Sequence, residues 1–124
     1  MFEVKANTVI VNGQTVAVSK NPKYKRGVPK VKTNTSFIGN EVVPTQSVDY
    51  SEAIGKCTIS LRNTLENITM LEDWQDNIGK NEVRMVDTDT GFTKTFKKLS
   101  VSEDVEIDFD SEEFEVIFEG GQGK

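Results

Sequence analysis

Alternation between apolar and polar residues constrains the fold of this chain more than any other feature of its sequence. In GKCTISLRN (residues 55–63), Cys57, Ile59 and Leu61 alternate with polar residues, and FEVIFEG (residues 114–120) shows the same period. Because successive side chains of a β-strand point to opposite faces, a period of two is typical of strands that bury one face. The chain is therefore predicted to consist mainly of β-sheet.

Turn signals divide the other β-rich segments into hairpins. In TVIVNGQTVAV, Asn12 and Gly13 lie between two β-rich runs, and this pair is typical of a tight hairpin because both residues tolerate a positive φ angle. KTNTSFIG (32–39) and EVVPTQSVDY (41–50) also read as strands. A further hairpin is predicted around DTDTG (87–91), between EVRMVD and FTKTFKKL.

The last part of the chain predicts two strands with acidic outer faces. In VEIDF, we expect Val105, Ile107 and Phe109 to point inward, and in FEVIFEG the Phe and Val residues do the same. The carboxylates expected on the outward face are Glu106, Asp108, Glu115 and Glu119. An acidic outer face is also expected of a strand whose outer side is simply exposed to solvent.

One segment changes period. Between Asn63 and Gly79, apolar residues recur three or four positions apart, which predicts a helix over residues 64–77 with one apolar stripe. Asn63 or Thr64 can cap its first turn, and Gly79 can close it in a left-handed conformation. The stripe runs on to Ile78, and four of its members are expected to form the core beneath the helix: Leu65, Ile68, Leu71 and Trp74.

These segments predict one domain over residues 1–124, of mainly β (α+β) class. It should contain about seven to nine short antiparallel strands and one amphipathic helix, arranged as a β-sandwich or a barrel. The helix is expected to pack on an end or an open face of the sheet.

Composition argues against several classes of function. The chain has no histidine, the commonest general base and metal ligand, and its single cysteine, Cys57, cannot form an internal disulfide. We therefore expect no enzyme activity, no cofactor and no metal, although a hydrolase needs only two carboxylates. The longest apolar runs are three residues, so we expect no membrane insertion, and the N-terminus predicts no signal peptide.

Charge is distributed unevenly along the chain. Residues 1–40 contain seven basic residues and one acidic residue, whereas residues 101–124 contain one basic and nine acidic residues. Such asymmetry between segments indicates a partner more than it indicates a fold. Identical subunits with oppositely charged ends can dock head to tail, which produces rings or open stacks.

The basic residues concentrate in KNPKYKRGVPKVK, residues 20–32. Pro22, Gly27 and Pro29 interrupt regular structure there, so this basic loop is predicted to be extended or to form the tip of a long hairpin. Its candidate contact residues are Lys20, Lys23, Tyr24, Lys25, Arg26, Lys30 and Lys32. Three interpretations are open: a nucleic-acid contact, which the sequence pI near 4.8 disfavours, a solvated loop, or a contact with another copy of the chain.

The runs CTISLRNTLENITMLEDWQDN and NEVRMVDTDTGFTKTFKKLSVSEDVEIDFDSEEFEVIFEGG resemble the tail tube proteins of contractile-tailed phages, most of all the branch typified by phage Mu. The resemblance covers roughly residues 31–120, and FEVIFEG is its most specific part. The first thirty residues depart from that pattern, so the role of the basic loop rests on its charge.

The resemblance implies a β-sandwich subunit that forms hexameric rings, which stack into a hollow tube with an acidic lumen for DNA ejection. It implies a virion location in the tail, assembly in the host cytoplasm, and a sheath, a baseplate or tube initiator and a tail terminator as partners. We expect the basic loop to bind acidic surface of another copy, such as that around residues 103–115. The carboxylates Glu106, Asp108, Glu115 and Glu119 are expected to belong either to that receiving surface or to the wall of the lumen. The alternatives are a small β-sheet module that binds an anionic polymer such as nucleic acid, and a tube subunit of a phage-tail-like bacteriocin or injection machine.

Overall fold

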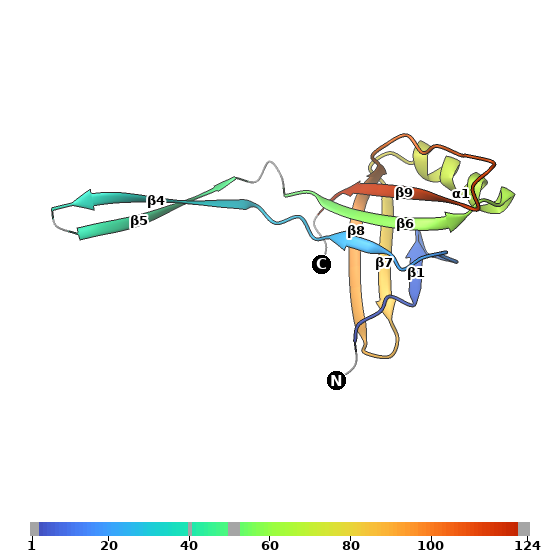
Figure 1. The fold of residues 1–124 in the computed structure, drawn as a ribbon, viewed down its shortest axis with the longest axis horizontal. Coiled ribbons are helices and arrows are strands. Elements are labelled where there is room, and N and C mark those ends of the chain that lie inside the picture. The colour runs from blue at the N-terminus through green and yellow to red at the C-terminus, as the bar shows by residue number, and fades with distance from the viewer. Residues whose placement is uncertain (1–2, 40, 50–52, 122–124) are drawn as a thin grey trace.

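A computed structural model of the chain describes residues 3–39, 41–49 and 53–121. It shows a folded body from which a long β-hairpin, the arm, projects (Figure 1). The strands are β1 (Thr8–Val11), β2 (Gln14–Val16), β3 (Lys23–Lys25), β4 (Lys30–Ile38), β5 (Glu41–Asp49), β6 (Gly55–Arg62), β7 (Asn81–Asp87), β8 (Phe92–Val101) and β9 (Glu113–Gly120), and the helix is α1 (Leu65–Asp76). The predicted fold class is confirmed.

Seven strands of the body form one antiparallel sheet in the order β2-β1-β7-β8-β9-β6-β3. Strand β8 pairs with β7 from Phe92 to Leu99 and then with β9 through Ser100 and Val101. The register shifts where this change occurs, and Lys98 there has a φ angle of 58°. This bulge bends β8, so β1 and β7 run across the direction of β6 and β9 (Figure 1).

The sheet nearly closes on itself. Val18 follows β2 and forms an isolated bridge with Leu61 of β6, and the Ser19 amide donates to the carbonyl oxygen of Ser60 at 2.9 Å. These contacts join the β2 end of the sheet to β6 near its other end. The body therefore combines two crossed layers with a barrel-like closure.

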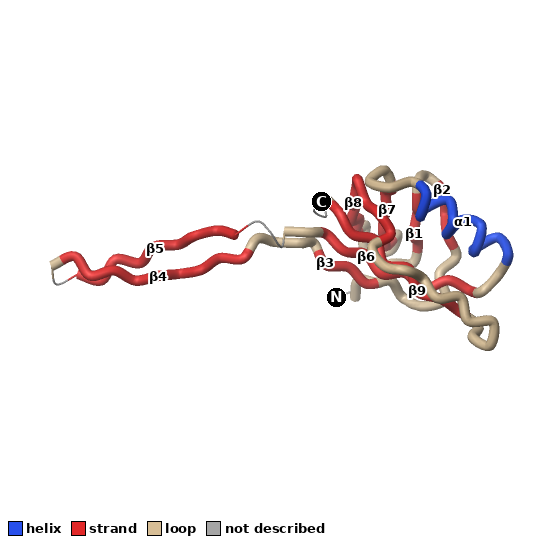
Figure 2. Tube along the Cα trace, turned by 90° about the horizontal axis from the view of Figure 1, so that it is seen from above, coloured by secondary structure: helices blue, strands red, loops and turns tan. Residues whose placement is uncertain are grey.

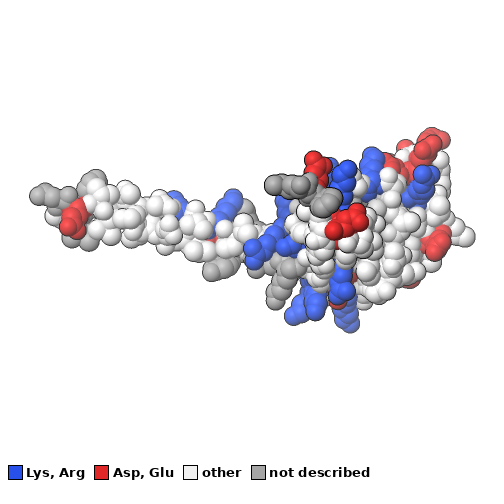
Figure 3. All heavy atoms as spheres, turned by 90° about the horizontal axis from the view of Figure 1, so that it is seen from below, with Lys and Arg blue, Asp and Glu red and all other residues white. Residues whose placement is uncertain are grey.

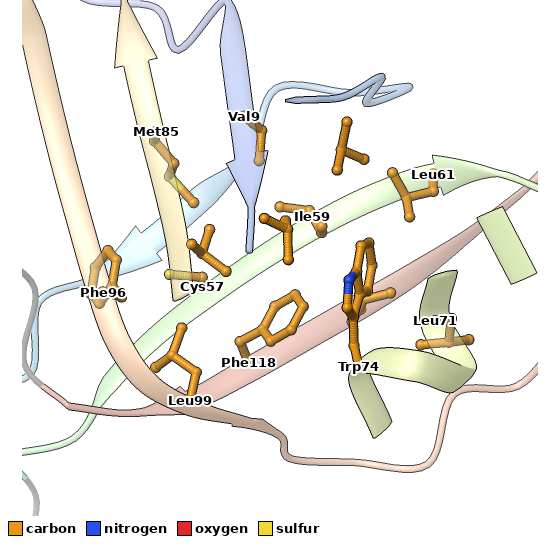
Figure 4. Close-up of a cluster of buried hydrophobic side chains, with 14 of the residues drawn as sticks. Val9, Cys57, Ile59, Leu61, Leu71, Trp74, Met85, Phe96, Leu99 and Phe118 are labelled. Carbon is orange, nitrogen blue, oxygen red and sulfur yellow. The ribbon is translucent and has the colours of Figure 1, made fainter. Parts of the chain in front are cut away.

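The core lies between the two layers (Figure 4). The inner face predicted for β6 and β9 is confirmed, since Cys57, Ile59 and Leu61 are buried together with the apolar face of β9, while Ser60 on the outer face of β6 is buried as well. Helix α1 covers one end of this core. The Trp74 ring lies 5.5 Å from that of Phe118, and Leu71 is also buried.

Helix α1 begins and ends close to the predicted positions. The Thr64 hydroxyl accepts a hydrogen bond from the Asn67 amide as the N-cap, and Gly79, just past the helix, has a φ angle of 71°. The prediction that Leu65 belongs to the core was wrong, because its side chain is 83% exposed, and Ile78 is exposed as well. Leu65 is the first residue of the helix and Ile78 lies in the turn after it, whereas Ile68 is partly buried against the core.

The buried side chain of Asn81 joins the helix to three parts of the sheet. Its amide nitrogen Nδ2 lies 3.0 to 3.1 Å from the carbonyl oxygens of Trp74, Asn77 and Leu99, which share its two hydrogens. Its oxygen Oδ1 accepts from Asn12 Nδ2, in the β1–β2 turn, at 3.0 Å. The Trp74 and Asn77 carbonyls lie at the end of the helix and also accept from the backbone amides of Asn77 and Lys80, whereas the Leu99 carbonyl lies at the β8 bulge. Asn81 therefore ties the end of the helix to the bulge.

Residues 102–112 form a loop, so the strand predicted at VEIDF was wrong. The Asp108 carboxylate accepts from the Asp110 amide at 2.9 Å and its carbonyl from the Ser111 amide at 3.0 Å, which makes a tight turn in place of a strand. Val105 and Ile107 still pack against the core. Phe109 does not, because it follows Asp108 in this turn and is 86% exposed.

The arm consists of β4 and β5, paired from Lys30↔Asp49 to Ile38↔Glu41, and in the described chain it leaves the body without packing on it (Figure 2). The basic loop is therefore β3 and the first residues of β4, as the root of a long hairpin. Gly27 lies between these strands with a φ angle of 78°, and a Cβ atom there would come within 2.3 Å of the Ile54 carbonyl carbon. This close approach fixes the junction between body and arm.

Candidate assembly surfaces

Lys20 and Tyr24, which are among the predicted contact residues of the basic loop, make contacts within the chain. Lys20 Nζ lies 2.6 Å from a Glu113 carboxylate oxygen, which raises the pKa of Lys20 and lowers the pKa of Glu113. The Tyr24 ring lies 6.2 Å from the Phe92 ring and 5.7 Å from the Phe96 ring, so it packs between the layers at the end of the sandwich. Lys20 and Tyr24 thus attach the loop to the body.

The other basic residues gather where the arm meets the body (Figure 3). Lys23 and Lys25 are exposed on β3, and Lys30 and Lys32 begin β4. In the pairing of β3 with β6, Lys25 lies directly opposite Lys56, another cation. We call Lys23, Lys25, Lys32 and Lys56 the basic root of the arm.

The outer face of the β6–β9 pair is mixed in charge. Strand β9 presents Glu115 and Glu119 outward as predicted, but β6 places Lys56 opposite Glu119 and Arg62 opposite Glu113. The Lys56 ammonium lies 3.9 Å from a Glu119 carboxylate oxygen. The outward carboxylates of β9 are therefore paired in part with cations of the neighbouring strand β6, whose outer face the sequence already assigned to Lys56 and Arg62.

Unopposed carboxylates concentrate instead in the loop of residues 102–112, which lies beside α1 at the end of the body away from the arm (Figure 1). Glu106 and Asp108 belong to this loop and not to a strand. All of its acidic residues are exposed: Glu103, Asp104, Glu106, Asp108, Asp110 and Glu112. The described chain is therefore basic at the arm root and acidic at the opposite end.

A groove opens at this acidic end, between the start of α1 and the acidic loop. Its volume is about 660 Å³, and Leu65, Ile68 and Phe109 supply its apolar surface. Asn63 holds its two sides together, since its Nδ2 donates to the Asp108 carbonyl oxygen at 3.0 Å and to that of Ser111 at 3.4 Å. The groove was not predicted from the sequence, where Leu65 and Phe109 both matched the pattern of core residues.

The arm has two different faces. Alternation along the register places Val31, Thr33, Val42, Pro44 and Val48 on one face, which carries no charge. All four charged residues of the arm fall on the other face: Lys30, Lys32, Glu41 and Asp49. Val31, Val42 and Val48 are 46 to 58% exposed. Thr35 and Gln46 also lie on the uncharged face, so it carries exposed valines among uncharged polar residues.

The carboxylates with a perturbed pKa lie at contacts between segments of the described chain. No group of three or more metal-ligating side chains is present among them. The acids with a lowered pKa are Glu113, which Lys20 and Ser19 stabilise, and Asp87, whose carboxylate accepts from the backbone amides of Lys5 and Asp89. Both sets of contacts hold segments of the fold together. No helix in the described part of the chain is long and apolar enough to cross a membrane.

No protein-family model and no curated protein matches this chain. Among solved structures, the fold is similar to a chain in the cryo-EM structure of the anti-feeding prophage cap, described as the tube terminating cap. The similarity has a TM-score of 0.58 and covers 100% of this chain and 91% of that chain, at 9% sequence identity. At this identity the comparison shows a shared fold.

Proposed function

We propose that this chain is a structural subunit of a phage-tail-like tube, which assembles into hexameric rings that stack around a hollow lumen. The tube conducts DNA during ejection in a virion tail, or another cargo in a related injection machine. Its partners are further copies of the chain, a sheath, a baseplate or tube initiator and a terminator. The chain has no catalytic role in this account.

The uncovered arm is the observation that carries the proposal. A two-stranded hairpin alone is at best marginally stable in water, and natural proteins avoid exposing long strand edges. Here β4 and β5 pair over nine residues each, and the valines of the uncharged face, Val31, Val42 and Val48, are exposed in the described chain. The arm therefore has the form of an element that a neighbouring subunit covers.

Charge polarity supports a neighbour of the same kind. The basic root lies at one end of the body and the acidic loop at the other, so the two ends of identical copies complement each other in a head-to-tail contact. Contacts of this type generate closed rings or open stacks. Glu106 and Asp108 are then part of the receiving surface, while Glu115 and Glu119 on β9 remain candidates for the lumen wall.

The structural likeness supports the same class of assembly, because the similar chain comes from a structure of a prophage tube cap. That comparison also gives reason to consider a second function, in which this chain terminates a tube. A terminator should form rings that do not stack on themselves, whereas a tube subunit should extend indefinitely.

Sedimentation velocity of the purified chain, over a range of protein and salt concentrations, tests the proposal. We expect a concentration-dependent change from monomer to large species, with salt weakening it because charged ends make the contact. A species that stops at a single ring supports the terminator function. A chain that stays monomeric but binds labelled DNA in a salt-sensitive way contradicts both functions and supports the anionic-polymer module.

A further inference from the structure

Asn12 and Gly13 form the turn between β1 and β2, and they are the only Asn-Gly pair in the sequence. Asparagine is one of the thermolabile residues of proteins. It is most labile before glycine, because a glycine has no side chain to hinder the approach of its own amide nitrogen to the asparagine side chain. Both residues are exposed, so water reaches the turn. The turn therefore has the composition and the exposure of a deamidation site.

Deamidation at such a pair needs no reagent other than water. The Gly13 nitrogen loses its proton to the solvent and attacks Asn12 Cγ, so that a bond forms between these two atoms. The Cγ–Nδ2 bond breaks, and Nδ2 takes up a proton and leaves as ammonia. Water then opens the resulting succinimide at either of its carbonyls and leaves aspartate or isoaspartate. The first step requires the Asn12 side chain to reach an attack geometry with the Gly13 nitrogen.

Hydrogen bonds to β7 hold the Asn12 side chain in the folded chain. Asn12 Nδ2 donates to Asn81 Oδ1 at 3.0 Å, and Asn12 Oδ1 accepts from the Glu82 amide at 2.8 Å. The Asn12 amide also donates to the Glu82 carbonyl oxygen at 2.9 Å. Asn81 is itself held at the end of α1 and at the β8 bulge. The side chain can therefore turn toward Gly13 only when these hydrogen bonds break.

The product of the reaction would not fit where Asn12 lies. A carboxylate has no hydrogen to donate, so it would place an oxygen against Asn81 Oδ1, where Asn12 Nδ2 now donates. Asp73 and Asp76 line the groove of about 410 Å³ that Asn12 shares with the end of α1. The new negative charge would therefore meet an acceptor and two like charges, and the turn could not return to its original contacts with β7.

We propose that Asn12 is a deamidation site that its hydrogen bonds to Asn81 and Glu82 keep closed in the folded chain. Separation of the β1–β2 turn from β7 opens the site, and the modification then makes this separation permanent. The site belongs to a single chain, so the inference does not depend on assembly into a tube.

Peptide mapping by mass spectrometry tests the site. We would incubate the purified chain at mildly alkaline pH, folded or unfolded in guanidinium chloride, and measure the rate at which the peptide that contains Asn12 is deamidated. The folded chain should react roughly tenfold more slowly or less, because two side-chain hydrogen bonds must break first. Equal rates in the folded and the unfolded chain would overturn the inference.

Asn81→Ala removes the acceptor of Asn12 Nδ2 and should speed the reaction of the folded chain several-fold. This change also weakens the whole fold, so Leu71→Ala is the matched control. Leu71 is buried and lies outside the groove beside Asn12, and its truncation destabilises the fold while both partners of Asn12 stay in place. The two variants are compared at a temperature at which circular dichroism shows both folded. Equal rates would show that the site responds to general loosening and not to Asn81, which would also overturn the inference.

An independent variant, Asn12→Asp, carries the product from the start and needs no incubation. It should unfold at a lower urea concentration than the unaltered chain, because the carboxylate faces Asn81 Oδ1, Asp73 and Asp76. The control is Asn7→Asp, at an exposed asparagine that bonds Thr88 away from this groove. If both variants unfold at the same midpoint as the unaltered chain, the modification leaves the turn in place and the proposed effect is wrong.

Discussion

Lys25 lies directly opposite Lys56 in the antiparallel pairing of β3 with β6. Like charges at directly opposed positions destabilise a sheet, typically by a few tenths of a kcal/mol to about 1 kcal/mol. The Glu119 carboxylate lies 3.9 Å from the Lys56 ammonium and so offsets one of these two charges. The isolated chain therefore carries an unfavourable pair at the root of its arm, which an acidic surface of a neighbouring subunit would relieve.

Replacing Lys25 with Glu should stabilise the monomer and prevent assembly. The new carboxylate would face Lys56 across the strands, so the free energy of unfolding of the dilute chain should rise by about 0.5 kcal/mol. The acidic end of a second copy would now meet a like charge. Thermal unfolding and sedimentation velocity measure the two effects, and Lys80→Glu, at an exposed turn residue, makes the same change in net charge elsewhere. Assembly of K25E chains at the normal yield would exclude the basic root as a contact.

Replacing Asn81 with Ala should destabilise the body by about 2 to 4 kcal/mol, because it removes a buried amide that joins the end of the helix to the Leu99 carbonyl and to Asn12. The matched control is Asn7→Ala, since Asn7 is exposed and its amide donates to Thr88 at 2.9 Å. That change should stay within about 0.5 kcal/mol. Urea unfolding measures both, and equal losses would show that Asn81 is not a hub of the fold.

Trp74 and Leu65 are both apolar residues of α1 and should respond oppositely to truncation. Trp74→Ala removes a buried ring that packs on Phe118, so we expect a loss of about 3 to 5 kcal/mol. Leu65→Ala should change stability by less than about 0.5 kcal/mol, because the side chain is exposed. A large loss for Leu65→Ala, measured by thermal unfolding of the dilute chain, would contradict the orientation of the helix.

Gly27 and Gly39 test the junction of the arm. Both have a positive φ angle, 78° and 64°, but a Cβ atom at Gly27 would clash with the Ile54 backbone, whereas none would meet an atom within 4 Å at Gly39. Gly27→Ala should therefore displace the arm and reduce assembly strongly, and Gly39→Ala should cost only about 1 kcal/mol of local strain. Sedimentation velocity measures the yield of large species for each variant. Equal yields would show that assembly does not depend on the close contact between Gly27 and Ile54.

Acid should weaken the fold through Glu113 and Asp87. Both pKa values are lowered in the folded state, that of Glu113 by Lys20 and Ser19 and that of Asp87 by the Lys5 and Asp89 amides. Such groups stabilise the fold above their ordinary values of 4.5 and 3.8, and this stability is lost as the pH falls through their folded pKa values. In Glu113→Gln chains the free energy of unfolding should depend less steeply on pH below 4.5. An unchanged slope would contradict the role of the Lys20–Glu113 pair.

The sequence predicted most of the elements because local chemistry determines them. The Asn12-Gly13 pair adopts the positive φ angles of 52° and 81° that a tight hairpin requires, and the alternation in β6 and β9 matches their burial. The apolar stripe predicted for α1 is buried at Leu71 and Trp74 but exposed at Leu65. Periodicity shows which side of a helix is apolar, but it does not show how much of that side the rest of the fold covers.

The assembly surfaces could be predicted only in part. The basic loop and the acidic tail were visible in the charge distribution, but the pairing of Lys20 with Glu113 joins residues far apart in the chain and was not. The segments 32–39 and 41–50 read as ordinary strands, and nothing local distinguishes an arm from a strand of the body. The groove arises because the Asp108 turn releases Phe109 from the core, which alternation alone cannot reveal.

Negative-stain electron microscopy of the unaltered chain, at increasing protein concentration and without nucleic acid, tests self-assembly most directly. The account predicts hollow rings with sixfold symmetry that stack into tubes as the concentration rises and that come apart at high salt. Dispersed single particles at every concentration and salt condition would contradict it.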